Sequence, residues 1–197
     1  TTPLQLCLMT AQIANGGYKI KPHIIRDESI NYESARLKIA NQFVNETADF
    51  SNDEKFLVDR DYKLYERLYR DPKNIEFIKD AMFGSTNEQY GTSYKSRYDD
   101  LKYQYAGKTG TSQVKRITEE ERKLDLDQSQ IEYKNRDHAL FIAFAPYKNP
   151  RYSISVLVEH GGSGSSGAAP LASKLIKKII DRHSLREQIE KGSTSLA

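Results

Sequence analysis

Two β-type segments joined by a short connection constrain the fold more than any other feature of this chain. Residues 138–146 form a largely apolar run, which is typical of a strand that is covered on both faces. Residues 152–158 alternate between apolar and more polar side chains, the pattern of a strand with one more polar face. The connection contains Asn149 and Pro150 and is about four residues long, so it predicts an antiparallel hairpin.

A third strand and a helix complete this unit. Residues 102–114 are expected to form a strand before the hairpin, and the glycine-rich residues 161–167 turn the chain into an amphipathic helix at 168–181. We therefore predict an α/β fold with three antiparallel strands in sequence order and this helix packed on the sheet. The helix residues that support the prediction are small Ala168, Ala169 and Ala172 for close packing, and Lys174, Lys177 and Lys178 on a solvated face opposite Leu171, Leu175 and Ile179.

The N-terminal half predicts more helix than strand. Thr2 can cap a helix that begins at Pro3 and stops at Asn15-Gly16-Gly17. The other expected elements are a short strand at 18–25, a helix at 59–69 broken by Asp71-Pro72, a helix at 74–83, a polar loop at 84–100, and a last helix at 184–191 before a frayed tail.

The composition is polar for a self-contained α/β enzyme. The chain has 197 residues, of which 38% are hydrophobic and 29% are charged. Two charged stretches, about 27–58 and 115–137, are predicted to be solvent-exposed insertions, with a helix near 33–41 in the first. The net charge of +3 arises from 30 basic and 27 acidic residues, which is too balanced to favour a nucleic-acid partner.

Cysteine, histidine and acidic residues do not predict a metal or cofactor. Cys7 is the single cysteine and lies among apolar residues, which is typical of a small buried side chain. The four histidines are scattered, and the acidic residues near Asp125 lack the glycine of a calcium loop, with Gln130 in its place. No apolar run reaches the ~20 residues that span a membrane. We expect no metal, no cofactor and no membrane segment in this chain.

A glycine-bounded polar run, Gly107-Lys108-Thr109-Gly110-Thr111, lies inside the first predicted strand. Its first three residues also imitate the end of a phosphate-binding loop. That loop needs a glycine five residues before Gly107, where this chain has Lys102, and bulky aromatics fill the interval. The sequence therefore disfavours nucleotide binding. Taken alone, K-T-G fits equally well a strand that ends in a turn.

Several segments in order around K-T-G resemble class B penicillin-binding proteins, and the elongation-type subgroup in particular. The resemblance covers most of the chain except the charged stretches at 27–74 and 115–137. The segments that carry it are Thr2-Pro3-Leu4-Gln5-Leu6, Asn15-Gly16-Gly17, Lys21-Pro22-His23, Gly91-Thr92-Ser93, the K-T-G run, His138–Phe141, Ala143–Pro146, Val158–Gly162 and Gly167–Pro170.

The resemblance implies acyl transfer through a serine ester, in which a peptidoglycan stem peptide ending in D-Ala-D-Ala is cross-linked to a second peptide. It implies that Lys108 supplies positive charge and helps to move the proton, and that Thr111 donates a backbone N–H to the oxyanion. Thr109 and Thr111 would bind the substrate carboxylate through their hydroxyls, while Gly110 would leave room for the substrate backbone. Other implied ligands and partners are β-lactam antibiotics and elongation-complex proteins. The implied location is the periplasmic face of the bacterial inner membrane.

The serine nucleophile that this chemistry needs is missing from the chain. The only S-x-x-K match is Ser112 to Lys115, and in a strand these two side chains point to opposite faces. Two S-x-N matches, Ser29-Ile30-Asn31 and Ser85-Thr86-Asn87, lie after the Thr-Pro-Leu-Gln segment, whereas the family places its functional copy before it. We therefore expect the matches to be coincidental and the missing motifs to precede Thr1.

These observations predict a partial penicillin-binding transpeptidase fold, similar to serine β-lactamases. Residues 1–183 would be the C-terminal portion of the transpeptidase domain and 184–197 a C-terminal helix and tail. The parent would be a D,D-transpeptidase, and the isolated chain would be inactive. Two alternatives remain open: a β-lactam-sensing receptor domain and a non-catalytic module of the same fold. An incomplete sheet would leave an exposed edge, which favours self-association.

Overall fold

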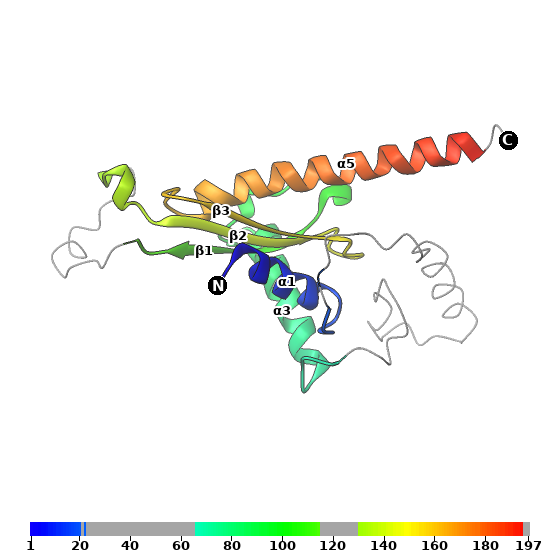
Figure 1. Ribbon diagram of the computed structural model, residues 1–197, viewed down its shortest axis with the longest axis horizontal. Helices are drawn as coiled ribbons and strands as arrows, with labels where there is room; N and C mark the ends of the chain where they lie inside the picture. Colours follow the sequence, from blue (N-terminus) through cyan, green and yellow to red (C-terminus); the bar gives the residue numbers. More distant parts are fainter. Residues whose placement is uncertain (21, 23–65, 115–129, 195–197) are drawn as a thin grey trace.

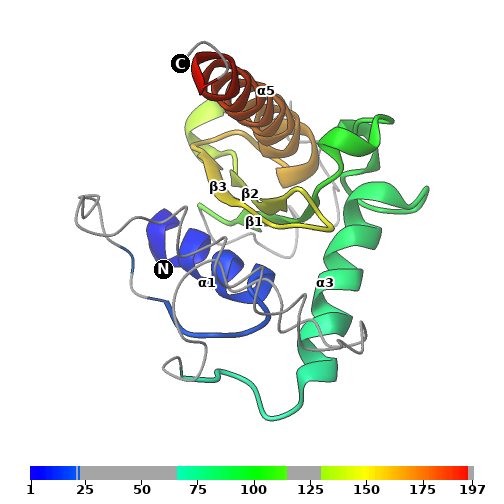
Figure 2. The same ribbon diagram turned by 90° about the vertical axis from the view of Figure 1, so that its right-hand side faces the viewer.

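The computed structural model describes residues 1–20, 22, 66–114 and 130–194, with side-chain surroundings up to residue 184. The described part is built in layers around a three-stranded antiparallel sheet. Helix α5 (Ala169–Thr194) lies along one face of the sheet, and helices α1 (Pro3–Ala14) and α3 (Pro72–Asn87) lie on the other (Figures 1 and 2). This arrangement confirms the predicted α/β fold with a helix packed on the sheet.

The sheet has the strand order β1 (Ala106–Ser112), β2 (His138–Ala145) and β3 (Tyr152–Val158). Both pairings are antiparallel, as predicted, and Phe141 stands opposite Thr109 on one side and Val156 on the other. The first strand is shorter than expected because residues 101–103 form a 3₁₀ turn, η4. Its start is capped by the Asp100 carboxylate, which accepts a 2.9 Å hydrogen bond from the backbone N–H of Lys102.

The apolar core lies on both faces of β2. On the α5 side, Phe141 is fully buried and meets Tyr105 edge to face at 6.3 Å. On the α1 and α3 side, Phe144 is fully buried against Ala14, Met82 and Ala106. A strand buried on both faces must be apolar at successive positions, which explains the continuous run that the sequence shows at 138–145.

Helix α5 differs from the prediction in its length and in its buried face. A five-residue π-helical turn, η7 (Gly164–Ala168), leads into it, and it continues unbroken to Thr194. The separate helix expected at 184–191 is therefore wrong: Ser184 donates a 3.0 Å hydrogen bond to the carbonyl of Ile180 and continues the helix instead of capping a new one. The expected close packing of Ala168, Ala169 and Ala172 on the sheet is confirmed. The apolar face expected at Leu171 and Leu175 is wrong, since these side chains are 46% and 45% exposed. The face on the sheet consists of Ala168, Ala169, Ala172, Ile176 and Ile180.

Helix α1 agrees with the sequence in detail. Thr2 and Gln5 form a reciprocal capping box, Pro3 occupies the first turn, and Gly16 and Gly17 follow the helix with φ of 91° and 89°. Cys7 is half-buried, which is less than the full burial predicted for it, and its Sγ lies 3.2 Å from the Ser153 hydroxyl oxygen. The thiol therefore links α1 to β3.

The expected strand at 18–25 and helix at 59–69 are described only in part, and that part differs from the prediction. Tyr18 and Arg67 form an isolated antiparallel bridge, and the backbone N–H of Leu68 donates to Gly17 O at 2.9 Å. Residues 66–69 are thus extended rather than helical, because they pair with the chain that leaves α1. The remainder of both segments, the helix expected near 33–41 and the insertion at 27–58 lie outside the described residues.

Helix α3 begins earlier and ends later than the predicted 74–83. Asp71 caps it and Pro72 opens it, so this pair starts a helix instead of breaking one. The helix runs to Asn87 and occupies the start of the expected loop, which then contains the 3₁₀ turn η3 (Tyr94–Ser96).

Of the excursion expected at 115–137, residues 130–137 are described and include the 3₁₀ turn η6 (Tyr133–Asn135). No helix in the described part of the chain has the length and apolar character needed to cross a membrane.

Candidate functional site

The K-T-G run forms the centre of β1, which is an edge strand of the described sheet. Thr109 and Thr111 stand opposite Phe141 and Ala139, whose side chains belong to the core beneath α5. Because side chains alternate along a strand, Lys108 lies on the opposite face, toward α1 and α3. The Lys108 side chain is exposed, and its Nζ donates a 2.8 Å hydrogen bond to the carbonyl of Thr109. The strand thus presents an ammonium group on one face and two hydroxyls on the other.

The turn η7 rests directly on the backbone of the motif. A Cβ added to Gly164 would lie 2.4 Å from the carbonyl oxygen of Gly110 and 2.5 Å from that of Leu140. Only a residue without a side chain permits this approach. Gly164 therefore lets η7 support β1 at the glycine between the two threonines.

The C-terminal end of α3 holds the start of β1. The hydroxyl of Thr86 and the amide nitrogen of Asn87 each lie 2.9 Å from the carbonyl oxygen of Tyr105 and donate to it. Thr86 is fully buried, so its hydroxyl has no access to water as an alternative partner. Thr86 and Asn87, which belong to the S-x-N match Ser85-Thr86-Asn87, thus anchor the start of the strand.

Tyr105 also connects the start of β1 to η3 and α5. Its hydroxyl donates a 2.9 Å hydrogen bond to Ser96 O, which accepts a second bond of 2.6 Å from the hydroxyl of Ser173. Burial raises the pKa of the Tyr105 hydroxyl, so the phenol stays neutral and keeps its proton for this bond. The start of β1, η3 and the distant helix α5 therefore meet at one carbonyl oxygen.

A row of hydroxyls leads from α3 to the motif. The Oγ of Ser85 lies 3.2 Å from the Oγ1 of Thr92, which in turn lies 3.1 Å from the Oγ1 of Thr109. Sequence reasoning placed Thr92 only in a segment that resembles the family, and it missed Gly164. No local pattern indicates either contact, because both depend on tertiary packing.

Beside this row lies a cavity of about 620 Å³ between residues 89–98 and the first turns of α5. Thr92 is among its lining residues, and three cationic side chains give the cavity a positive character. Arg97 forms a 2.8 Å ion pair with Asp99 and lies over the ring of Tyr94 at 3.8 Å. The other two cations are Lys95 and Lys174.

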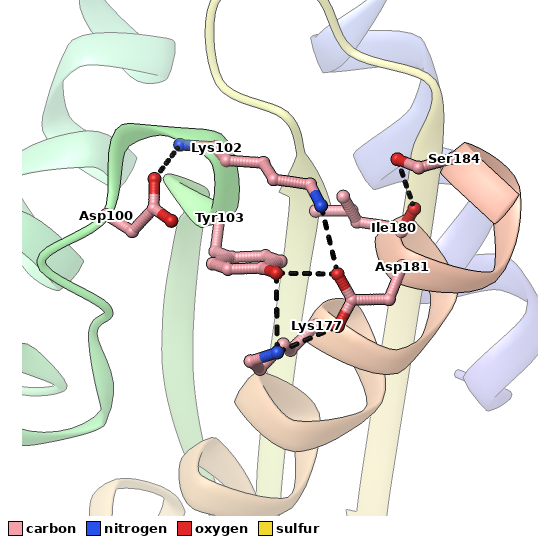
Figure 3. Close-up of polar contacts among 7 residues, drawn as sticks. All are labelled: Asp100, Lys102, Tyr103, Lys177, Ile180, Asp181 and Ser184. Carbon is pink, nitrogen blue, oxygen red and sulfur yellow. Dashed lines mark hydrogen bonds and ion pairs between the residues drawn. The ribbon is translucent and has the colours of Figure 1, made fainter. Parts of the chain in front are cut away.

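A cluster of four polar side chains holds residues 102 and 103, which precede β1, against α5 (Figure 3). Asp181 accepts hydrogen bonds from Lys177 at 2.7 Å, from Lys102 at 3.1 Å and from the hydroxyl of Tyr103 at 2.6 Å. The bonds from Lys177, Tyr103 and Lys102, in that order, lower the pKa of Asp181 far below its ordinary value. Lys177 is therefore a cluster member, whereas its neighbours Lys174 and Lys178 are exposed as predicted.

The alternative motifs are described only in part. Ser112 is exposed at the end of β1 opposite His138, while Lys115 lies outside the described residues, as does Ser29-Ile30-Asn31. The expectation that Ser112 is not a nucleophile therefore remains a prediction. Among the described residues, no three His, Cys, Asp or Glu side chains gather as they would around a metal ion.

Comparison with known proteins identifies the class. The model of the penicillin-binding protein transpeptidase domain matches residues 1–177, and the chain belongs to this family. Among curated relatives, the peptidoglycan D,D-transpeptidase MrdA of Salmonella typhimurium is 29% identical over 91% of this chain and 25% of its own length. MrdA of Haemophilus influenzae is 37% identical over 59% of this chain and 17% of its own length.

Solved structures agree with this assignment. A complex of penicillin-binding protein 2 (PBP2) with MreC from Helicobacter pylori matches with a TM-score of 0.61 and 26% identity, over 92% of this chain and 25% of that one. Pseudomonas aeruginosa PBP2 in complex with WCK 5153 matches with a TM-score of 0.56 and 31% identity, over 89% of this chain and 29% of that one. The chain thus spans about a quarter of the length of the first curated relatives that it matches.

Proposed function

We propose that this chain forms the K-T-G part of the active site of a peptidoglycan D,D-transpeptidase of the elongation type. The observation that carries the proposal is an edge strand with an exposed lysine and two threonines, in a chain whose residues 1–177 match the transpeptidase domain. The parent enzyme, meaning the complete transpeptidase to which the chain would belong, supplies the serine nucleophile. The parent would act at the periplasmic face of the bacterial inner membrane.

In the proposed reaction the serine Oγ attacks the carbonyl between the two D-Ala residues of a stem peptide. The peptide bond breaks, the terminal D-Ala leaves with a proton, and the amine of a second peptide then takes the acyl group and returns the proton to the serine. A penicillin would be attacked in the same way at its lactam carbonyl. The negative charge that develops on the carbonyl oxygen requires a donor, which is the proposed role of the Thr111 backbone N–H.

The proposed roles of the motif side chains follow from their chemistry. The terminal carboxylate of the substrate is an acceptor only, so the hydroxyls of Thr109 and Thr111 would donate to it. The ammonium of Lys108, on the other face of the edge strand, would supply the positive field around it. Among the described residues, no carboxylate lies within ion-pair distance of Lys108, so its charge remains available to a ligand. A free edge on β1 would allow the substrate backbone to lie alongside the strand next to Gly110.

Two of the related structures are complexes. The Pseudomonas aeruginosa PBP2 structure contains WCK 5153, and the Helicobacter pylori structure contains MreC. We propose that the parent binds stem peptides and β-lactams and assembles with proteins of the elongation complex.

Acylation by labelled penicillin tests the function. We expect the parent to form a stoichiometric adduct, and the Lys108→Ala variant to form it about a hundredfold more slowly, because transition-state charge loses its stabilisation. Lys178→Ala, which removes an exposed lysine of α5, serves as the matched control and should acylate normally. The isolated chain should show no adduct by mass spectrometry, since the only S-x-x-K match in its sequence is Ser112 to Lys115, which we predict to be coincidental.

Two outcomes would contradict the proposal. Normal acylation of Lys108→Ala would remove the role given to this lysine, and an adduct that maps to Ser112 would show that the nucleophile had been misassigned. Cross-linking of stem peptides by the parent would distinguish an enzyme from a β-lactam-sensing receptor, which would be acylated without turning over peptide.

A further inference from the structure

We infer that Thr92 is a positioning residue, which orients the hydroxyl of Thr109 toward the carboxylate of the bound substrate or drug. This inference rests on the proposed function, because it gives Thr109 a ligand to bind. Thr92 lies 17 positions before Thr109 in the sequence, yet the two hydroxyl oxygens are 3.1 Å apart. That distance is within hydrogen-bond range for two hydroxyl groups.

The direction of these hydrogen bonds decides whether the hydroxyl of Thr109 has a proton to donate to a ligand. Each hydroxyl has one proton to donate and can accept two bonds. If Ser85 donates to Thr92 and Thr92 donates to Thr109, the proton of Thr109 is left for a ligand. In the reverse direction Thr109 would donate to Thr92 and would have no proton to offer. A carboxylate ligand accepts only, so its binding selects the first direction.

The segment that carries Thr92 is mounted firmly on the end of α3. Ser93 is buried, and its backbone N–H and its hydroxyl donate to Ser85 O at 3.0 and 2.9 Å. A Cβ added to Gly91 would lie 2.4 Å from both Gly84 O and Ser85 O, so this backbone is in direct contact with the helix. The backbone of Thr92 is therefore held by its neighbours on both sides, which sets the position from which its hydroxyl reaches Thr109.

The same helix end fixes the strand that carries Thr109. Thr86 and Asn87 donate to the carbonyl of Tyr105, at the start of β1. The segments that carry Thr92 and Thr109 are thus both hydrogen-bonded to residues 85–87, which sets the distance between the two threonines. A group held in this way lowers the entropic cost of orienting a ligand, which is how a side chain that contacts no substrate contributes to binding.

The test uses the parent enzyme and a paired probe. Acylation rates are measured with a β-lactam that has a free carboxylate and with its methyl ester, and the ratio of the two rates reports carboxylate recognition. Thr92→Val removes the hydroxyl while keeping the shape of the side chain, and Thr92→Ser restores the hydroxyl. Ser155→Ala is the control, because it deletes a half-buried hydroxyl on β3, two strands away from β1.

We expect Thr92→Val to lower the carboxylate-to-ester ratio by about three- to tenfold, the loss typical of one hydrogen bond. Thr92→Ser should recover most of the ratio, and Ser155→Ala should keep the wild-type value. A purely structural role would slow acylation by both probes equally and leave the ratio unchanged, which would overturn the inference. Failure of the wild-type parent to acylate at all would overturn the proposed function together with this inference.

Discussion

Replacing Gly164 by alanine tests how closely the turn before α5 supports the K-T-G strand. The added Cβ would lie 2.4 Å from Gly110 O, whereas ordinary van der Waals contact begins at 3.4 Å. The turn and the strand would have to separate by about 1.0 Å, the difference between these two distances. The opposing atoms belong to backbone that is hydrogen-bonded in the sheet, so neither can rotate away.

The expected loss of stability follows from two opposing terms. Overpacking a well-filled site costs about 1–3 kcal/mol. Gly164 is not among the residues with positive φ, so alanine can adopt its backbone conformation, and restricting the unfolded chain returns about 0.4–1 kcal/mol. The free energy of unfolding should therefore fall by about 1–2 kcal/mol.

Urea unfolding of the 197-residue chain measures this change. With a urea m-value of about 2 kcal/mol/M, the unfolding midpoint should fall by about 0.5–1 M. Gly84→Ala is the matched control, because the three atoms nearest to its new Cβ all belong to the flexible Glu88 side chain, at 3.0 Å or more. Since Gly84 lies inside α3, that variant should be unchanged or more stable by up to about 1 kcal/mol. Equal midpoints for Gly164→Ala and wild type would refute the close support of β1 by η7.

Two further predictions concern the surface of the molecule. The pKa of Asp181 is lowered by its hydrogen bonds, so its cluster with Lys102, Tyr103 and Lys177 should stabilise the fold above the ordinary value of 3.8 and lose that contribution progressively as the pH falls below it. Asp181→Asn should therefore flatten the acid limb of a plot of urea midpoint against pH, and an unchanged limb would argue against the cluster. β1 lies at an edge of the described sheet, which should allow self-association at high protein concentration, and light scattering that shows a strict monomer would contradict this.

The sequence predicted the elements whose signals are local. The apolar run at 138–145 and the alternation at 152–158 predicted β2 and β3, and Thr2 with Pro3 predicted the start of α1. These patterns arise from backbone geometry and from burial on one or two faces, so a short window contains the information.

Elements that depend on distant partners were predicted poorly. Residues 66–69 show helical spacing, yet they are extended because Arg67 pairs with Tyr18. Leu171 and Leu175 suggested an apolar helix face, but the small alanines turn the other side of α5 toward the sheet. The motif residues 108–111 were correctly placed on a strand, whereas the contact of Thr92 with Thr109 required the position of α3 to be known.

The anchoring of Tyr105 by Thr86 and Asn87 has a consequence for drug sensitivity under the proposed function. A substitution of Thr86 or Asn87 would remove a donor that holds the start of β1, without altering any side chain of the K-T-G run. A strain could thus acquire resistance while its K-T-G residues stay intact. Genetic screens that inspect only the motif would miss such changes, so they should also include residues 84–93.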